Sequence, residues 1–375
     1  MVIVFYSFLL ALILLNALSK RKNENKLYFL AILLVWFLLV FVNDDYVDWK
    51  TYQGIFNRST YLYYTKDIGF GVLCYILKSF GFEAISLRIV IYTIGLFLLD
   101  RALRMVNVNK LLFLSFYCFY PVPSDAMHLR TCIVSYILIY AIISYIKDKK
   151  WIKYMLLIAI AMLFHKMAVL YIPFVFINKV EKNNKCTKAF LAFVGISVLL
   201  VGWNRSLISR LSGALVNISE SVEMGNITNS IGAGIKNGWI IDWILQLSFF
   251  TIIFFIRNYF KKTYPNDRYP IECIFWINVI ALIFLPFYFI SFDYFRLFRN
   301  MLAVEYMAFC MYIQEFPMKG IRIISTKKIV ALIIAIVIVG ITGYMKVGFR
   351  GRASLEFYNF YYNDHISFIE YKGTD

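Results

Sequence analysis

The chain has 375 residues, of which 61% are hydrophobic and 16% charged, and its mean hydropathy is +0.69. A soluble domain of this composition would expose apolar surface on every side, so the composition excludes a soluble globular protein and indicates an all-α, polytopic integral membrane protein. The net charge of +17 would suggest nucleic-acid binding in a soluble chain. Here the basic residues lie between apolar runs and report orientation, so no nucleic-acid partner is expected.

About 10 apolar runs approach the roughly 20 residues that a full transmembrane helix needs, which predicts a single transmembrane domain over residues 1–375. The runs cover residues 2–18, 28–43, 84–100, 111–123, 129–146, 188–203, 239–256, 271–291, 300–315 and 328–345. The first run lacks preceding basic residues and a small-residue cleavage site, so we expect a retained helix. The six cysteines share no CxxC spacing, so no disulfide, metal site or cofactor is expected.

Lysine and arginine cluster in alternate connections between these runs, at residues 20–26, 101–110, 147–153, 179–188, 257–268 and 319–328. By the positive-inside rule these clusters are cytoplasmic, so both termini are expected outside. The remaining connections are then external, and they hold most of the polar residues. They are the loops 44–83 and 204–238, the turns 121–129 and 292–299, and the tail 346–375.

The segment 151–178 breaks this alternation because lysines flank it on both sides. A single span cannot begin and end in the cytoplasm, so we predict a re-entrant hairpin of two short helices that turns at Phe164, His165 and Lys166. Each half has about 13 residues and is near 20 Å long, which is too short to cross a bilayer. The alternative is one span with an inverted topology.

Charged residues gather on the predicted external side, where burial in a bilayer would make them costly unless they face water or a partner. Arg296 and Arg299 lie three residues apart, so a helix would place them on one face. Together with Arg130 they match an anionic ligand with several oxygens, such as phosphate or diphosphate. The alternative for interfacial arginines is that they extend to lipid headgroups.

Acids and a histidine complete this set. Asp48 lies just outside the second apolar run, where its carboxylate could take a proton from a sugar hydroxyl. The alternative is that Asp45 and Asp48 belong to a solvated loop. His165 could act as a base, donate a hydrogen bond to phosphate, or cap the hairpin. Further candidates are Tyr52, Asp67 and Lys166.

Five short motifs in one order make the chain resemble the EpsG/Wzy group of bacterial polysaccharide polymerases. They are Asp48-Trp49-x-x-Tyr52-x-x-x-Phe56, Asp67-Ile-Gly69-Phe70, Leu129-Arg130, Ala161-Met-Leu-Phe164-His165-x-x-Ala168 and Tyr294-Phe-Arg296. Two departures matter. The region of Asp45 and Asp48 differs from the group's usual Gly-Thr-Asp-Tyr, so these two acids compete for one role. Thr131 stands where the group commonly has glutamine.

The resemblance implies a GT-C-like, metal-independent glycosyltransferase in the bacterial inner membrane, with its site facing the periplasm or outside. Its substrate would be an undecaprenyl-diphosphate-linked oligosaccharide, and its partners a chain-length regulator and a flippase. Arg130, Arg296 and Arg299 would bind the diphosphate, Asp48 would act as base, and His165 would orient or donate to the diphosphate. The alternatives are a flippase or transporter for lipid-linked glycans and a ligase that changes only the acceptor.

Overall fold

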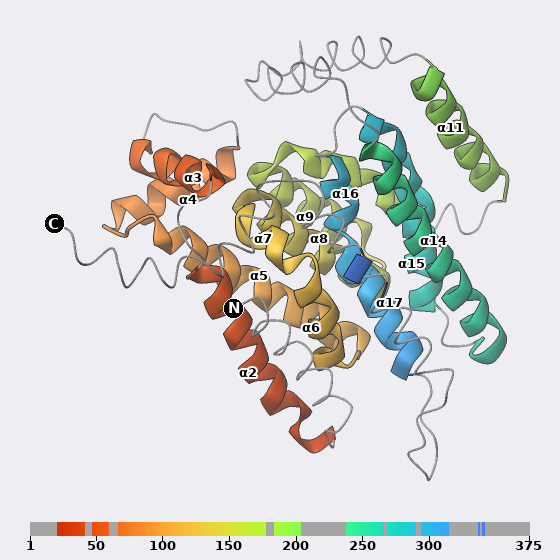
Figure 1. The fold of residues 1–375 in the computed structure, drawn as a ribbon, viewed down its shortest axis with the longest axis horizontal. Coiled ribbons are helices and arrows are strands. Elements are labelled where there is room, and N and C mark those ends of the chain that lie inside the picture. The colour runs from red at the N-terminus through yellow and green to blue at the C-terminus, as the bar shows by residue number, and fades with distance from the viewer. Residues whose placement is uncertain are drawn as a thin grey trace.

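The computed structural model describes residues 21–41, 47–59, 67–177, 184–203, 238–265, 269–289 and 294–314, together with 337, 340 and 341. Every regular element in these ranges is helical, as the all-α prediction requires, and Figure 1 shows their arrangement. The first apolar run, Asp45, residues 204–237 of the predicted loop 204–238 and the tail 346–375 lie outside the described residues.

The helices follow one another along the chain without strands between them in the described ranges. They are α2 (Arg21–Val40), α3 (Val47–Arg58), α4 (Ile68–Ser79), α5 (Ile85–Val106), α6 (Lys110–Phe119), α7 (Val122–Met127), α8 (Leu129–Asp148), α9 (Trp151–Phe164), η1 (Lys166–Phe176), α11 (Asn184–Trp203), α14 (Gly238–Thr263), α15 (Tyr269–Ala281), η2 (Leu282–Phe289), α16 (Phe295–Arg299) and α17 (Leu302–Gln314).

The core of the fold is built around α8, which carries apolar residues on all its faces and is almost wholly buried. A helix that is hydrophobic all round needs neighbours on every side. Helices α5 and α9 supply the largest of these contacts, and α7, α15 and α17 complete them. Gly95 of α5 lies so close to α8 that a Cβ atom at this position would stand 2.2 Å from Cδ2 of Tyr136.

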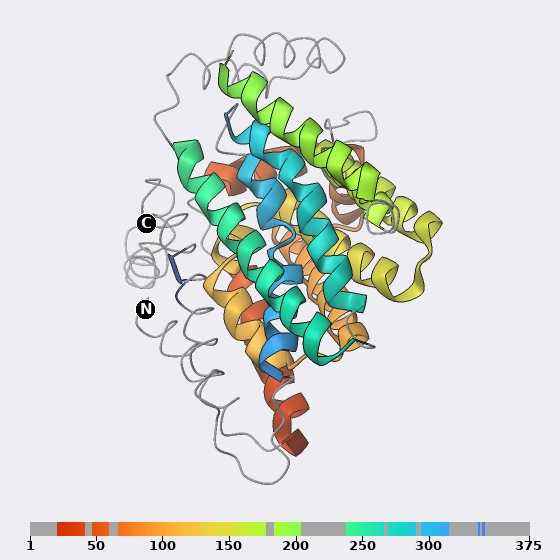
Figure 2. The same cartoon turned by 90° about the vertical axis from the view of Figure 1, so that its right-hand side faces the viewer.

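Among the described residues, three helical stretches are long and apolar enough to cross a membrane. They are Leu129–Asp148, Trp239–Thr263 and Tyr269–Tyr288. Five shorter apolar helices accompany them, so the structure fits a membrane protein, whereas the predicted total of about 10 full spans stays a prediction. Helices α14 and α15 lie side by side in both ribbon views (Figure 2). The bidentate pair of Arg257 with Glu272 joins them.

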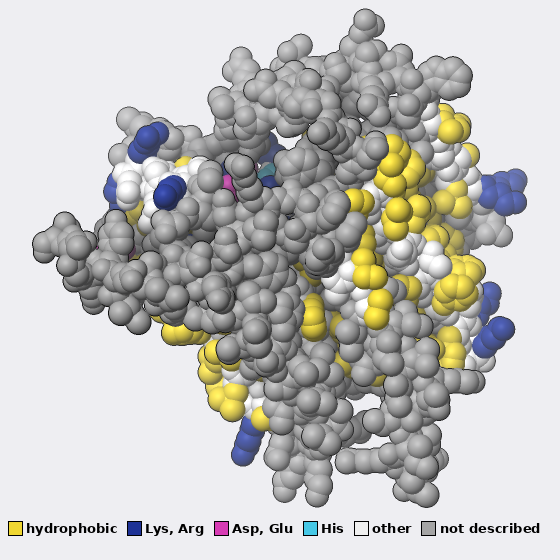
Figure 3. Space-filling model, viewed as in Figure 1, with side chains coloured by type: hydrophobic (Ala, Val, Ile, Leu, Met, Phe, Trp, Pro, Cys, Tyr) yellow, Lys and Arg dark blue, Asp and Glu magenta, His cyan; other side chains and the backbone are white. Residues whose placement is uncertain are grey.

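The outer face of α14 is apolar and uncovered among the described residues. Ile244, Leu247 and Phe255 are exposed along it, and hydrophobic side chains dominate this flank of the space-filling view (Figure 3). Exposed apolar side chains in a row along one helix are unfavourable in water and favourable against lipid tails. This face is therefore suited to contact with the bilayer.

Residues 151–177 fold back on themselves. Tyr154, near the start of α9, donates a hydrogen bond of 2.7 Å to the carbonyl oxygen of Tyr171 in η1, and Tyr145 of α8 donates to that of Val175 at 2.8 Å. The second limb is a 3₁₀ helix with Pro173 inside it. Proline has no N–H for the i−4 carbonyl, which disfavours a regular α-helix there. The depth of this hairpin in a bilayer stays a prediction.

We expect Gly95→Ala to lower the melting temperature of the purified protein in detergent. The added methyl group must displace the Tyr136 ring or separate α5 from α8, and overpacking of this kind costs about 1–3 kcal/mol. Gly195→Ala in α11 is the matched control because a Cβ atom there meets nothing within 4 Å. Equal melting temperatures for the two variants would contradict this account of the α5–α8 contact.

Candidate functional site

The polar groups of the candidate site lie on short helices near Leu129, the first residue of α8. Asp48 lies in the first turn of α3, and Asp67 immediately precedes α4. The six-residue helix α7 leads into α8. The five-residue helix α16 contacts α7 through Arg299 and Asp125. Three connections far apart in the sequence, 44–83, 121–129 and 292–299, therefore contribute to one cluster.

Asp67 occupies an N-cap position, where an aspartate usually accepts a hydrogen bond from the first turn of its helix. Its side chain makes no such bond. Instead, the carboxylate accepts a hydrogen bond of 2.5 Å from Nη1 of Arg130. The Arg130 guanidinium also lies 5.7 Å from the centre of the Tyr52 ring. The sequence thus gives up a local cap to hold an arginine at the start of α8.

Asp48 faces His128, a residue that the sequence analysis did not select. The Oδ2 atom of Asp48 lies 3.6 Å from Nε2 of His128, and Nδ1 of the same ring lies 2.8 Å from the carbonyl oxygen of Ser124. A carbonyl oxygen only accepts hydrogen bonds, so Nδ1 carries the hydrogen and donates it. The Asp48 side chain is 44% exposed, which leaves this pair open to a ligand.

The three predicted arginines converge on this pair. Burial lowers the pKa of His128 well below its ordinary value, and the nearby charges of Arg296, Arg299 and Arg130 lower it further. Burial raises the pKa of Tyr52, which Arg130 and Arg296 oppose and Asp48 reinforces. Arg130 of α8 and Arg296 and Arg299 of α16 are therefore near enough to act electrostatically on His128, and their role in binding a ligand stays a prediction. Acidic, basic and histidine atoms are visible together beside the α3–α4 lobe (Figure 3).

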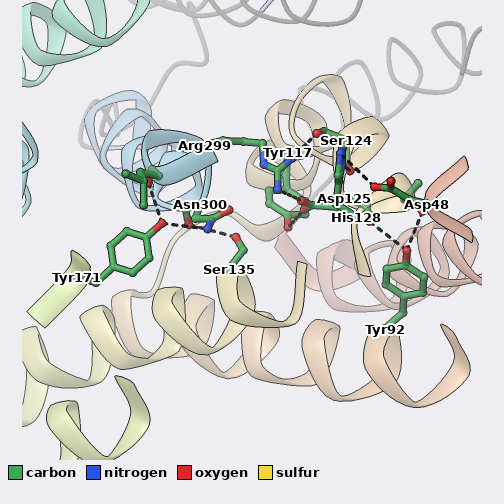
Figure 4. A network of polar contacts seen from close by, with 12 residues as sticks. Asp48, Tyr92, Tyr117, Ser124, Asp125, His128, Ser135, Tyr171, Arg299 and Asn300 are labelled. Atoms are coloured by element: carbon green, nitrogen blue, oxygen red, sulfur yellow. Dashed lines mark hydrogen bonds and ion pairs between the residues drawn. The ribbon is translucent and has the colours of Figure 1, made fainter. Parts of the chain in front are cut away.

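Arg299 differs from the other two arginines because it lies behind the surface, with 2% of its side chain exposed. Its Nη1 atom donates a hydrogen bond to Oγ of Ser124, and Nη2 lies 3.9 Å from Oδ1 of Asp125. Figure 4 shows these groups between α16 and α7. Burial raises the pKa of Asp125 to about 6, while Arg299 and the hydroxyl of Tyr117 oppose the rise.

Two tyrosine hydroxyls donate hydrogen bonds to the Asp125 carboxylate and to the backbone of α7. Tyr117 donates a hydrogen bond of 2.8 Å to Oδ2 of Asp125, and Tyr92 donates to the backbone oxygens of Asp125 and Ala126 at 3.1 and 3.2 Å. The side chains of Tyr92, Tyr117, Asp125 and Ala126 are all buried. The segment that carries Ser124 and His128 is therefore fixed by groups from α5, α6 and α16.

A second set of contacts joins the α9–η1 hairpin to α16. Nδ2 of Asn300 donates a hydrogen bond of 2.9 Å to the Tyr171 hydroxyl, which donates to the carbonyl oxygen of Leu297 at 3.0 Å. Ser135 of α8 donates to the carbonyl oxygen of Asn300 at 3.2 Å. These bonds tie α8, α16 and the hairpin together beside Arg299 (Figure 4).

The remaining candidates lie at the turn of the hairpin. Nδ1 of His165 accepts a hydrogen bond of 3.2 Å from the backbone N–H of Met167, which caps η1 as one predicted alternative has it. Lys166 is exposed. A Cβ atom on Gly69 would stand 2.8 Å from Cβ of Leu163, so this end of α9 lies against the turn that follows Asp67. A catalytic role for His165 stays a prediction.

The residues that sequence reasoning missed had only a weak signal. The missed residues are Ser124, Asp125 and His128. They lie within the same seven residues as the selected Arg130, where a long apolar run begins. That concentration of polar groups is unusual, but Asp125 and His128 lie in a connection that also reads as a solvated turn. Within the described ranges, no group of three or more His, Cys, Asp or Glu side chains is placed to hold a metal ion.

We expect Arg299→Gln to destabilise the protein because it leaves the Asp125 carboxylate buried without its cation. Breaking a buried pair in this way costs about 3–5 kcal/mol, and adding Asp125→Asn should recover part of the loss in melting temperature. The matched control is Arg104→Gln, which removes an exposed ion pair with Asp100 and should cost at most about 1 kcal/mol. If both arginine variants melted alike, the bracing role of Arg299 would be wrong.

Comparison with known proteins places the chain in a family. No curated protein and no solved structure matches it. A family model described as the EpsG family matches residues 25–363. The matched range includes every described residue of the cluster, from Asp48 to Asn300. Because the match extends over most of the sequence, this chain belongs to the EpsG family.

Proposed function

We propose that the protein is a polysaccharide repeat-unit polymerase that transfers an undecaprenyl-diphosphate-linked growing glycan onto a hydroxyl of a lipid-linked repeat unit. Membership of the EpsG family indicates a polysaccharide polymerase-type function, and the long apolar helices fit a membrane protein. The observation that carries the proposal is the convergence of Arg130 and Arg296 on the open Asp48–His128 pair. We place this site at the outer face of the bacterial inner membrane.

The proposed reaction needs cationic donors fixed at one point. A hydroxyl of the acceptor sugar attacks the anomeric carbon of the donor, and the bond from that carbon to the lipid diphosphate breaks. Negative charge then grows on the departing diphosphate, where preorganised donors stabilise the transition state most effectively. A guanidinium matches two phosphate oxygens at once. We therefore assign the reaction to a GT-C-type glycosyltransferase in which arginines supply this charge.

The structure supports different duties for the three arginines. Arg130 is partly exposed, is held by Asp67 and lies beside Tyr52, and Arg296 is partly exposed on α16. We therefore propose that these two arginines contact the diphosphate. Arg299 is buried against α7, so it acts mainly by holding α16, and with it Arg296, in position.

The acceptor side of the site is formed by Asp48, whose carboxylate assists removal of the proton from the attacking hydroxyl. Its side chain is 44% exposed and lies 3.6 Å from Nε2 of His128. His165 is proposed to orient or donate to the diphosphate from the hairpin turn. A flippase and a chain-length regulator are the protein partners that such a polymerase would need.

We expect Arg130→Ala and Arg296→Ala each to slow polymerisation by about 100-fold or more, which is the usual loss when one preorganised donor is removed from a transition state. The measurement is a ladder gel of surface polysaccharide from cells that lack the gene and carry each variant, with the protein quantified in the membrane. Deletion should collapse the ladder to one repeat, and neither variant should restore it.

Arg58→Ala is the matched control, because Arg58 is an exposed arginine at the end of α3 outside the cluster. It should restore the full ladder. A ladder that persists on deletion would overturn the polymerase proposal. Long chains that accumulate on the carrier lipid after deletion would indicate a ligase instead. A flippase would be indicated if purified protein moved lipid-linked repeats without lengthening them.

A further inference from the structure

We propose that His128 is the group that takes the proton from the attacking hydroxyl, and that Asp48 acts through it by stabilising the imidazolium that forms. This inference rests on the proposed function and names a catalytic residue for it. It changes the duty of Asp48 from direct base to partner of the base.

The hydrogen-bonding pattern of the ring identifies the basic atom. Nδ1 of His128 lies 2.8 Å from the carbonyl oxygen of Ser124, so this nitrogen holds the hydrogen of the neutral ring. The lone pair is therefore on Nε2. That atom is the one on the side of Asp48, where the cluster is open.

Nε2 of His128 is placed to accept a hydrogen bond from a ligand that approaches on the exposed side of Asp48. Nε2 and Oδ2 of Asp48 are 3.6 Å apart, which is longer than an N–H···O hydrogen bond of about 2.7–3.2 Å. Both are acceptors when the ring is neutral, so they do not satisfy each other. A sugar hydroxyl that enters there can donate to Nε2, and once Nε2 is protonated the carboxylate is close enough to stabilise it.

The ring is also held in a fixed orientation, which a general base requires. The Ser124 residue that binds Nδ1 through its carbonyl oxygen also binds Arg299 through its hydroxyl. The following residue is held by Tyr117 and Tyr92. His128 therefore cannot turn away without breaking a buried network.

The charges that face the ring come from several elements. Arg130 lies on α8, Arg296 and Arg299 on α16, and all three disfavour a protonated ring. Asp48 on α3 favours it, and Asp125 lies on the same short helix as Ser124. The resting ring is therefore neutral and ready to accept a proton. A bound diphosphate would offset the arginines and make proton uptake easier.

The step balances as a simple displacement. The hydroxyl oxygen of the acceptor forms a bond to the anomeric carbon. The bond between that carbon and the diphosphate oxygen breaks, and its electron pair leaves with the diphosphate. The hydroxyl proton moves to Nε2 of His128 and is later released to water past the exposed Asp48 side chain.

The test uses the purified full-length protein and lipid-linked single repeats isolated from cells that lack the gene. We expect His128→Ala to reduce chain extension by about 100-fold or more, and added imidazole to restore part of the activity. Asp48→Asn should retain more activity than His128→Ala. Removing the anion lowers the pKa of the ring, so this variant should shift the acidic limb of the pH profile to lower pH.

The outcomes separate this inference from the proposed function. If the wild-type protein extends no chains, the proposed function itself fails. If the wild type is active and His128→Ala extends chains equally well, only the role of His128 fails. Loss of all activity in Asp48→Asn, with an unchanged acidic limb in His128→Ala and no rescue by imidazole, would make Asp48 the direct base.

Discussion

The site depends on one buried interaction, the contact of the Arg299 guanidinium with Ser124 and Asp125. A five-residue helix and a six-residue helix cannot hold their own geometry, because isolated helices of this length are unstable. The cation fixes one against the other inside the protein, where unpaired charge would be strongly unfavourable. Arg296, three residues earlier, and His128, four residues after Ser124, are positioned as a result. The positions of the more exposed groups of the cluster therefore depend on the buried ion pair of Arg299 with Asp125.

The large features of the fold could be predicted from the sequence because they follow from hydrophobicity. The apolar run 129–146 predicted α8, whose described bounds are Leu129–Asp148. The lysines around 151–178 indicated a segment that turns back near His165, and α9 ends at Phe164. Hydrophobicity alone does not give the number of full spans, because five of the described apolar helices are shorter than a bilayer is thick. The hairpin's second limb differs in detail, because Pro173 disfavours an α-helix.

The site was predictable only in part, for reasons that concern distance along the chain. Arg130, Arg296 and Asp48 were found because charge next to apolar runs is conspicuous, and the structure brings them together. The pairing of Asp48 with His128 joins two connections some eighty positions apart, and periodicity does not report such pairing. Arg299 is buried and Arg296 is partly exposed. This difference depends on how α16, a helix of little more than one turn, is rotated about its axis. Tyr117, which the sequence analysis did not select, is wholly buried and donates to Asp125.

Ser124 contacts both His128 and Arg299. Its backbone oxygen accepts a hydrogen bond from His128, and its hydroxyl oxygen accepts one from Arg299. The distance between His128 and Arg299 is thus set by one small residue, Ser124. In the proposed reaction, selectivity for a particular sugar is expected on the side where Asp48 is exposed. Helix α3 carries Asp48 to that side, and α4 lies against α3. A polymerase of the proposed kind would then change the glycan it recognises through substitutions on α3 and α4, while Ser124 still holds His128 and Arg299 in place.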